Sequence, residues 1–276
     1  MPETSFEQLL STPTVSVTDV CCLGNCRHKS EVEWTQNTRF VFPYRGVFMR
    51  HVGQDDAVAD ANQVLFFNGG QEYQISHPVS GGDACMSVGV APALVQELAP
   101  PEALARLAEP SFLTQHQRLD PRAQVLVALL RHSLRSGVAE TLEAETLALT
   151  LIRRSLGLAS APAGASHGRR RLVERIKLVL MSDPARRWTL ADIAAETGGS
   201  PVYLTQVFQQ VEGMPLYRYQ MQLRLARALD VIDQYDDLSA LSLDLGFSSH
   251  SHFSAAFRQA YGRSPSAFKQ AAVGAK

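Results

Sequence analysis

Three of the four cysteines in this 276-residue chain stand close together, in the segment CCLGNCRH. Cys21, Cys22 and Cys26 are followed by His28, and Cys85 lies far along the chain. The spacing C-x3-C-x-H, completed by a fourth ligand such as Cys85, suits zinc or another thiophilic metal. A metal site at Cys22, Cys26, His28 and Cys85 is therefore one of three roles that we expect for this cluster.

The two other roles of the cysteines are thiol sensing and packing. Arg27 and Lys29 flank His28, and positive neighbours favour the thiolate form that reacts with oxidants and electrophiles. Alternatively, the thiols pack as small apolar side chains on a strand, where Cys21 and Cys22 would point to opposite faces. The spacing leaves all three roles open.

The sequence lacks the common catalytic and nucleotide-binding motifs. The sequence contains no G-x-S-x-G, no P-loop and no G-x-G-x-x-G. His51, Glu72 and His77 could serve as ligands of a metal-dependent enzyme, but the first half of the chain has no H-x-H pair. We therefore expect a protein that is not an enzyme.

Length and charge predict two domains of different character. Hydrophobic residues make up 45% of the chain and the formal net charge is −1. Residues 1–167 hold 12 Lys and Arg against 17 Asp and Glu, whereas residues 168–276 hold 14 against 10. A basic C-terminal part suits nucleic-acid binding.

The sequence has no apolar run of about 18 residues, as a membrane helix needs, and no basic N-terminal start, as a signal peptide needs. We therefore expect a cytoplasmic protein without membrane contact. In that compartment its cysteines should be reduced thiols or ligands.

The elements expected to carry the cysteines are short strands. Runs of β-prone residues, separated by turn residues, occur at Val15–Cys22, Phe40–Phe42, Val47–His51, Val64–Phe67, Tyr73–Ile75 and Cys85–Val90. Many short strands with such turns predict a β-barrel or a β-sandwich. A short helix at Pro92–Leu98 and two Leu-rich amphipathic helices, within 120–137 and 142–156, are expected to follow.

A linker is predicted at residues 159–168, which are rich in Ala, Ser, Gly and Pro and lack a large apolar anchor. The domains would then be residues 1–158 and 169–276, the second opening with Arg169-Arg170-Arg171 on a helix.

Residues 189–213 predict a first helix-turn-helix unit. Thr189 and Asp192 have the spacing of a helix cap, Gly198-Gly199 ends the first helix, and Ser200-Pro201 begins the second. The second helix buries a stripe that includes Leu204 and Phe208. Its outward residues are Val202, Tyr203, Thr205, Gln206 and Gln209.

The pattern repeats at residues 238–262. A short apolar helix ends at Gly246, Ser248 or Ser249 caps the next helix, and Phe253 and Phe257 form its core face. Small polar side chains on the outward face suit base edges in the major groove. These outward residues are Ser249, His250, Ser251, His252, Ser254 and Arg258.

The segment LDLGFSSHSHFSAAFRQAYGRSPSAFK resembles the signature of the AraC/XylS family of bacterial transcription regulators. The preceding LADIAAETGGSPVYLTQVFQQVEGMPLYRYQMQLRLARAL resembles that family's first unit and connecting helix, so the likeness covers about the last hundred residues. The resemblance implies an α+β two-domain fold, with an N-terminal cupin-like β-barrel that senses an effector and a C-terminal all-α domain. The helices of residues 120–156 resemble the family's dimerisation element, although they could equally cover the open side of the barrel.

By this resemblance the base-reading positions fall on Val202, Thr205, Gln206, His250, Ser251, His252 and Ser254, and Arg258 is placed for a phosphate. The family often has Arg where Gln206 and Ala255 stand. Because this chain lacks those two positive charges, we expect its salt-dependent affinity for DNA to be weaker. His252 could instead pack locally.

The resemblance also implies the partners: double-stranded DNA, a second copy of the chain, a small-molecule, metal or redox effector, and RNA polymerase if the protein is an activator. We favour an activator over a repressor. The alternative is a cupin-type enzyme, or a metal- or thiol-binding module, fused to a DNA-binding domain. If the cysteines only pack, an organic effector in the barrel would have Arg45, His51 and Tyr73 as its next candidate contacts.

Overall fold

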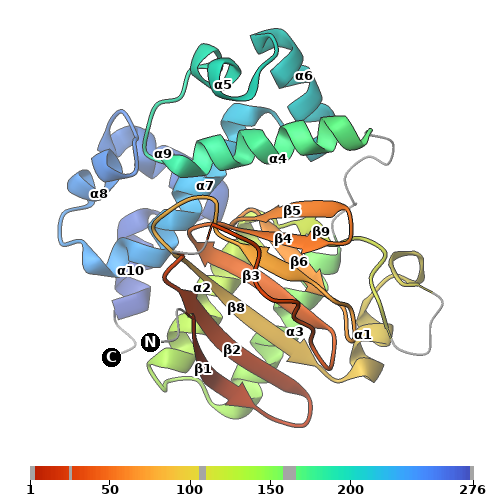
Figure 1. Ribbon diagram of the computed structural model, residues 1–276. Coiled ribbons are helices and arrows are strands. Elements are labelled where there is room, and N and C mark those ends of the chain that lie inside the picture. The colour runs from red at the N-terminus through yellow and green to blue at the C-terminus, as the bar shows by residue number, and fades with distance from the viewer. Residues whose placement is uncertain (1–3, 25–26, 106–109, 158–165, 274–276) are drawn as a thin grey trace. The chain divides into compact units, whose positions relative to one another are not determined.

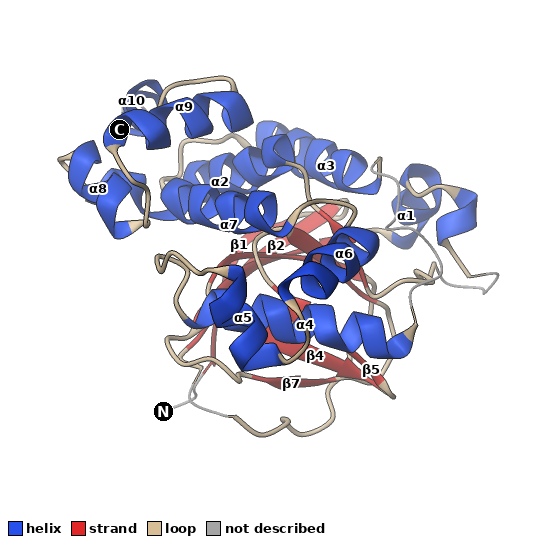
Figure 2. Ribbon diagram, turned by 90° about the horizontal axis from the view of Figure 1, so that it is seen from above, coloured by secondary structure: helices blue, strands red, loops and turns tan. Residues whose placement is uncertain are grey.

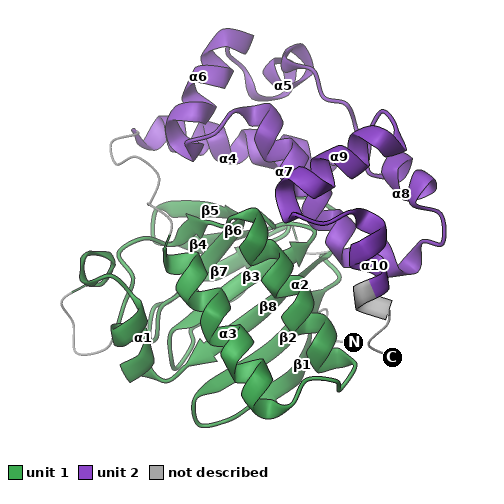
Figure 3. Ribbon diagram, turned by 180° about the vertical axis from the view of Figure 1, so that it is seen from behind, with its two compact units in different colours: residues 1–159, 276 green, residues 160–275 purple. Residues whose placement is uncertain are grey.

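The computed structural model describes residues 4–24, 27–105, 110–157 and 166–273 (Figure 1). The chain divides into two compact units, residues 1–159 and residues 160–275 (Figure 3). Cys26 and most of the predicted linker lie outside the described residues. In the part that is described, no helix is long and apolar enough to cross a membrane.

The described strands of the first unit form two antiparallel sheets. The larger has six strands in the order β1-β2-β8-β3-β6-β9, and the smaller has three in the order β5-β4-β7. Their bounds are β1 Thr4–Ser11, β2 Val15–Cys22, β3 Arg39–Arg45, β4 Phe48–Val52, β5 Asp55–Ala59, β6 Gln63–Phe67, β7 Gln74–Ser76, β8 Asp83–Val90 and β9 His116–Arg118.

Side chains alternate along β2 and so separate two apolar layers. Val15, Val17 and Cys21 point to the core that the large sheet shares with helices. Val20 packs on the opposite face, in a smaller core that includes Phe48 of β4 and therefore joins the two sheets. The first unit thus has helices on one side of the large sheet and the small sheet on the other.

Three helices accompany the sheets: α1 (Pro92–Leu98), α2 (Pro121–Arg135) and α3 (Thr141–Leu156). Helices α2 and α3 lie across the face of the large sheet (Figure 3), where Val127, Leu130, Leu151 and Ile152 are buried. The closed cupin-like barrel expected from the sequence is not formed by the described strands, because β1 and β9 are edges of an open sheet. The helices cover that sheet instead of a further layer of strands.

The described part of the second unit contains helices and loops only (Figure 2). Its helices are α4 His167–Ser182, α5 Leu190–Thr197, α6 Pro201–Glu212, α7 Leu216–Val231, α8 Leu238–Asp244, α9 His250–Tyr261 and α10 Pro265–Val273. The helix-turn-helix pairs predicted from the sequence are confirmed as α5–α6 and α8–α9. The predicted start of α4 was two residues late, because Ser166 caps this helix by accepting from the Arg169 backbone N–H.

Candidate DNA-binding surface and N-terminal cavity

The first helix-turn-helix unit is fixed by local capping. Thr189 and Asp192 form a reciprocal capping box at α5, and Ser200 Oγ accepts from the Tyr203 N–H at 3.2 Å to start α6. Phe208 is fully buried on α6 and meets the ring of Tyr219 on α7 edge to face, with centroids 5.2 Å apart. These contacts fix which side of α6 faces solvent.

A buried ion cluster also holds α6 in place. The Lys177 ammonium of α4 is 0% exposed and lies 3.0 Å from Glu174 Oε1 and 2.7 Å from Glu212 Oε1, at the end of α6. Two carboxylates around one cation satisfy a charge that could not otherwise be buried. The outward face of α6 is thereby fixed relative to α4.

The second helix-turn-helix, α8–α9, is also fixed by a cap and by buried aromatic rings. Ser249, rather than Ser248, caps α9, and its Oγ accepts from the His252 N–H at 3.1 Å. Phe253 and Phe257 are fully buried and stack edge to face with each other. The remaining side of α9 is left to solvent.

The residues predicted to read DNA lie on these two outward faces. On α6, Val202 is 66% and Tyr203 43% exposed, and Gln206 and Gln209 are also exposed. A groove of about 450 Å³ beside α6 is lined in part by Tyr203, Gln206 and Gln209, together with Arg169 of α4. On α9 the exposed members of the predicted set are Ser249, His250, Ser251, His252 and Arg258.

Four of the predicted residues already have hydrogen bonds within their own helix-turn-helix. Thr205 is half-buried and donates to the Val202 carbonyl at 2.8 Å. Ser254 Oγ and His250 Nε2 are 3.3 Å apart, and His252 Nδ1 is 3.1 Å from Ser248 Oγ. The His252 ring also packs edge to face on Phe247. His252 therefore has a local packing role whatever it does toward DNA.

Helix α7 joins the two helix-turn-helix units through Arg224, a contact that the sequence did not reveal. The guanidinium is buried, and it donates to the carbonyls of Pro184, Ala185 and Arg186 before α5 and to that of Gly246 in the second turn, at 2.8–3.2 Å. Burial lowers the pKa of Arg224. One side chain thus connects the turn of the second helix-turn-helix, α8–α9, to the start of the first, α5–α6.

Comparisons with known proteins found a family match for the helix-turn-helix region and several similar proteins. Residues 193–271 match the family of helix-turn-helix domains. The chain is 29% identical over 167 residues to a probable transcriptional regulator, LumQ, of Photobacterium leiognathi, covering 57% of this chain and 64% of LumQ. It is 30% identical over 136 residues to the HTH-type transcriptional activator RhaR of Klebsiella pneumoniae, covering 49% of this chain and 47% of RhaR. A crystal structure of an AraC-type transcriptional regulator from Chromobacterium violaceum aligns with 39% of this chain and 96% of that one, at 25% identity and a TM-score of 0.36.

The class that these matches define is a DNA-binding helix-turn-helix domain, which occupies the second unit. It is a domain of the AraC type, and the similar proteins that share it are named transcription regulators. The aligned segments span 64% of the length of LumQ and 47% of the length of RhaR, less than two thirds of each.

The first unit contains a cavity of about 490 Å³ between its two sheets. Its walls combine apolar side chains such as Val41, Phe48 and Ile75 with a few polar groups, among them Arg39 and Tyr73. This volume and this mixture are typical of sites for small molecules. Of the three organic-effector contacts suggested by the sequence, Tyr73 lines the cavity, whereas His51 is held between Asp56 and Ser76. Arg45 is not part of this wall either.

Arg39 is the arginine among the described residues of this wall. Its guanidinium donates to Ser87 Oγ at 2.6 Å, to the Ser87 carbonyl and to Thr18 Oγ1. Within the described residues these bonded partners are all neutral, and burial lowers the Arg39 pKa. Burial, followed by the charge of Glu33, raises the pKa of Tyr73 to about 12, so this phenol stays protonated and able to donate.

The cysteines are separated by the pleat of β2 rather than gathered. Cys21 faces the helical side, where its Sγ lies 3.9 Å from Tyr44 Oη. Cys22 and Cys85 line the cavity on the other face. Burial raises the pKa of the Cys85 thiol well above its ordinary value.

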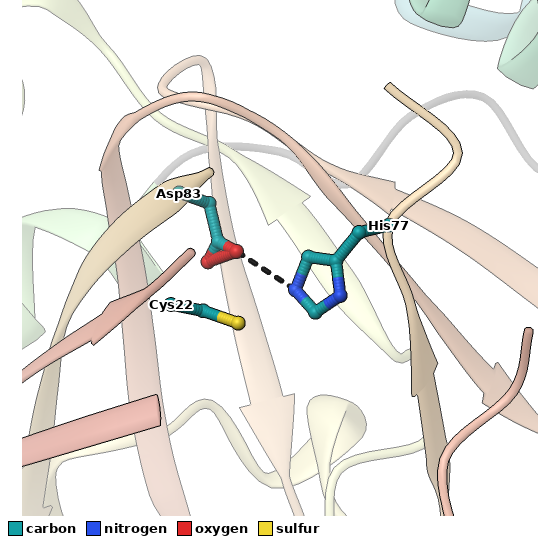
Figure 4. A group of neighbouring side chains, drawn as sticks. All are labelled: Cys22, His77 and Asp83. Carbon is teal, nitrogen blue, oxygen red and sulfur yellow. Dashed lines mark ion pairs between the residues drawn. The ribbon is translucent and has the colours of Figure 1, made fainter. Parts of the chain in front are cut away.

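Of the metal ligand set expected from the sequence, Cys26 lies outside the described residues, and among the described residues Cys22 has other neighbours. Cys22 lies beside His77 and Asp83 (Figure 4), and neither His28 nor Cys85 belongs to this group. His28 is exposed on the segment that follows the residues left undescribed. The sequence marks His77 as a possible metal ligand by its residue type, but only the strand pairing shows which residues lie beside it.

Proposed function

We propose that the chain is a sequence-specific DNA-binding transcription regulator that reads duplex DNA through the outward faces of α6 and α9. The observation that supports this most strongly is the pair of capped helix-turn-helix units within the AraC-type domain, each with an exposed polar face. On this proposal Gln206 bonds a base edge, most favourably adenine, and Arg258 contacts a phosphate.

The same proposal assigns signal reception to the first unit. The cavity between the sheets suits a small organic effector. Arg39, whose hydrogen-bond partners in the described part of the chain are neutral, would pair with an anionic group of that molecule. Activation, through contact with RNA polymerase, is favoured over repression because RhaR is named an activator. We also propose that two copies of the chain form a homodimer.

The deciding experiment is selection of fragments from a random duplex pool by the full-length protein, followed by gel-shift titration of the selected duplex. We expect a defined sequence motif and an affinity that falls steeply between about 50 and 200 mM salt, because Lys and Arg displace counterions from phosphates. Equal retardation of selected and scrambled duplexes at every salt concentration would contradict sequence-specific reading.

The rival class, an enzyme or a storage module fused to a DNA-binding domain, makes a different prediction. The similar proteins named above are regulators, which supports a sensor over an enzyme. Turnover of a compound that binds the cavity would favour the rival, whereas binding without turnover favours a sensor.

A further inference from the structure

We propose that Cys22, His77 and Asp83 form a binding site for one divalent cation of the zinc class, in the wall of the cavity between the two sheets. Their ligand atoms lie within 4.8 Å of one another, and the three side chains point toward a common centre (Figure 4). This set shares one residue with the metal site expected from the sequence. It stands whether or not the chain regulates transcription.

The strand register brings these three residues together from distant parts of the chain. Cys22 ends β2 and is paired directly with Asp83, the first residue of β8. His77 follows β7, which belongs to the smaller sheet. A cation bound by all three would therefore link the two sheets at this point of the cavity wall.

Two glycines position the ligands before any ion binds. A Cβ at Gly24 would lie 2.7 Å from Gly82 Cα, and a Cβ at Gly82 would lie 2.5 Å from the Cys22 carbonyl oxygen. Both residues also have positive φ, at 66° and 73°. Only glycine allows this close backbone approach, which holds the ends of β2 and β8 together.

The ligand chemistry selects the type of ion. A thiolate, a neutral imidazole and a carboxylate together suit zinc and similar borderline cations, whereas Mg²⁺ and Ca²⁺ prefer oxygen alone. Bonds of about 2.0–2.3 Å in a tetrahedral site place ligand atoms roughly 3.3–3.7 Å apart. His77 Nε2 and Asp83 Oδ1 are already 2.9 Å apart, so the sulfur has to move by about 1 Å at most, on the order of a side-chain rotation.

The surroundings favour a charged occupant. The side chains of His77 and Asp83 are only 10% and 6% exposed, and burying a carboxylate is costly unless a cation compensates it. The Cys22 sulfur receives two weak hydrogen bonds, from Thr4 Oγ1 at 3.5 Å and from the Gly24 N–H at 3.4 Å. Donors of this kind stabilise a thiolate ligand from outside the metal's own shell.

The fourth coordination position would open into the cavity, since all three ligands line its wall. Three protein ligands with one open position are typical of zinc ions that contact a small molecule. The site is thus arranged so that a molecule in the cavity could complete the coordination.

The proposal is tested on reduced, full-length protein that has been stripped with a chelator and titrated with Zn²⁺ by calorimetry, and with Co²⁺ by absorption. We expect one bound ion per chain and a thiolate-to-cobalt charge-transfer band. Cys22→Ser should remove the band, and His77→Gln and Asp83→Asn should each weaken Zn²⁺ binding at least about tenfold. Circular dichroism shows whether each variant is folded; if Asp83→Asn does not fold, the band and its loss in Cys22→Ser decide the question.

Matched variants separate this site from the other thiols. Cys21→Ser changes the adjacent thiol on the opposite face of β2 and should leave binding unchanged, as should His28→Gln and Cys26→Ser. No stoichiometric Zn²⁺ binding by the wild type would overturn the proposal, leaving His77 and Asp83 as an ion pair only. Loss of the ion in Cys26→Ser or His28→Gln would overturn it in favour of the ligand set expected from the sequence.

Discussion

At the scale of single residues, we expect base reading by α6 to depend most on Gln206. It is exposed beside the groove of this helix, and an amide can make two hydrogen bonds to one adenine. We expect Gln206→Ala to relax the preference at one or two base pairs and to cost about 1–3 kcal/mol at the preferred site.

The measurement is the selected sequence motif of the variant beside that of the wild type. Gln259→Ala, at an exposed position of α9 outside the predicted reading set, is the matched control and should leave the motif intact. Phe208→Ala should instead cost about 3–5 kcal/mol of stability, since it removes a fully buried ring. An unchanged motif in Gln206→Ala would show that the reading residues are assigned to the wrong positions.

Cys85 should be the thiol least able to act as a redox sensor. Burial raises its pKa, so less thiolate is present at any given pH, and the thiolate is the reactive form. We expect alkylation of Cys85 by iodoacetamide at pH 8 to be much slower than that of Cys22, and to accelerate only at higher pH or in urea. Peptide mass spectrometry gives the two rates, and equal rates in the folded protein would return Cys85 to the candidates for sensing.

At the scale of elements, the sequence predicted most where the signals are local. Ser200 and Ser249 start α6 and α9 because a side-chain oxygen satisfies a backbone N–H three residues on, which depends on neighbours alone. Strand β5 was missed because Gly53, Asp55 and Asp56 have the composition of a turn. Its residues are strand because they pair with β4, and such pairing is decided by distant residues.

The same limit explains what the sequence could not show about the sites. The open pair of sheets depends on which strands become neighbours, and the short β-prone runs do not specify that. The meeting of Cys22 with His77 and Asp83 follows from this pairing. The sequence likewise did not show that Arg224 would donate to carbonyls from segments before and after α7 in the chain, those of Pro184 and Gly246.

The contact between the two helix-turn-helix units can be tested at Gly246. This residue has a φ of +80°, and a Cβ there would lie 2.0 Å from the Ala185 carbonyl oxygen. Gly262 has a φ of +75° with nothing within 4 Å of its Cβ position, so it isolates the cost of backbone conformation. Gly262→Ala should cost about 1–3 kcal/mol of stability, and Gly246→Ala distinctly more. Thermal and urea denaturation give both values, and equal losses would mean that the close contact with Ala185 does not stabilise the domain.

At the scale of the whole molecule, the structure narrows the surface available for a dimer. The sequence suggested the two Leu-rich helices of residues 120–156, which are α2 and α3, as the dimerisation element. Leu130 is 0% exposed and packs against the large sheet, so Leu130→Glu would unfold the first unit rather than separate two chains. The leucines that remain exposed on these helices are Leu129, at 36%, and Leu142, at 74%.

We therefore expect Leu129→Glu and Leu142→Glu to shift the full-length protein from dimer to monomer while it remains folded, because each places a charge in an apolar contact. Sedimentation velocity over a range of concentrations measures the shift. Leu243→Glu, at a leucine of α8 that is 60% exposed in the other unit, is the matched control and should sediment as the wild type does. Since a dimer carries two copies of the DNA-binding domain, the monomeric variants should also bind the selected duplex more weakly, through the loss of linked binding. Dimers that persist in both variants, with folding intact, would place the interface on another surface.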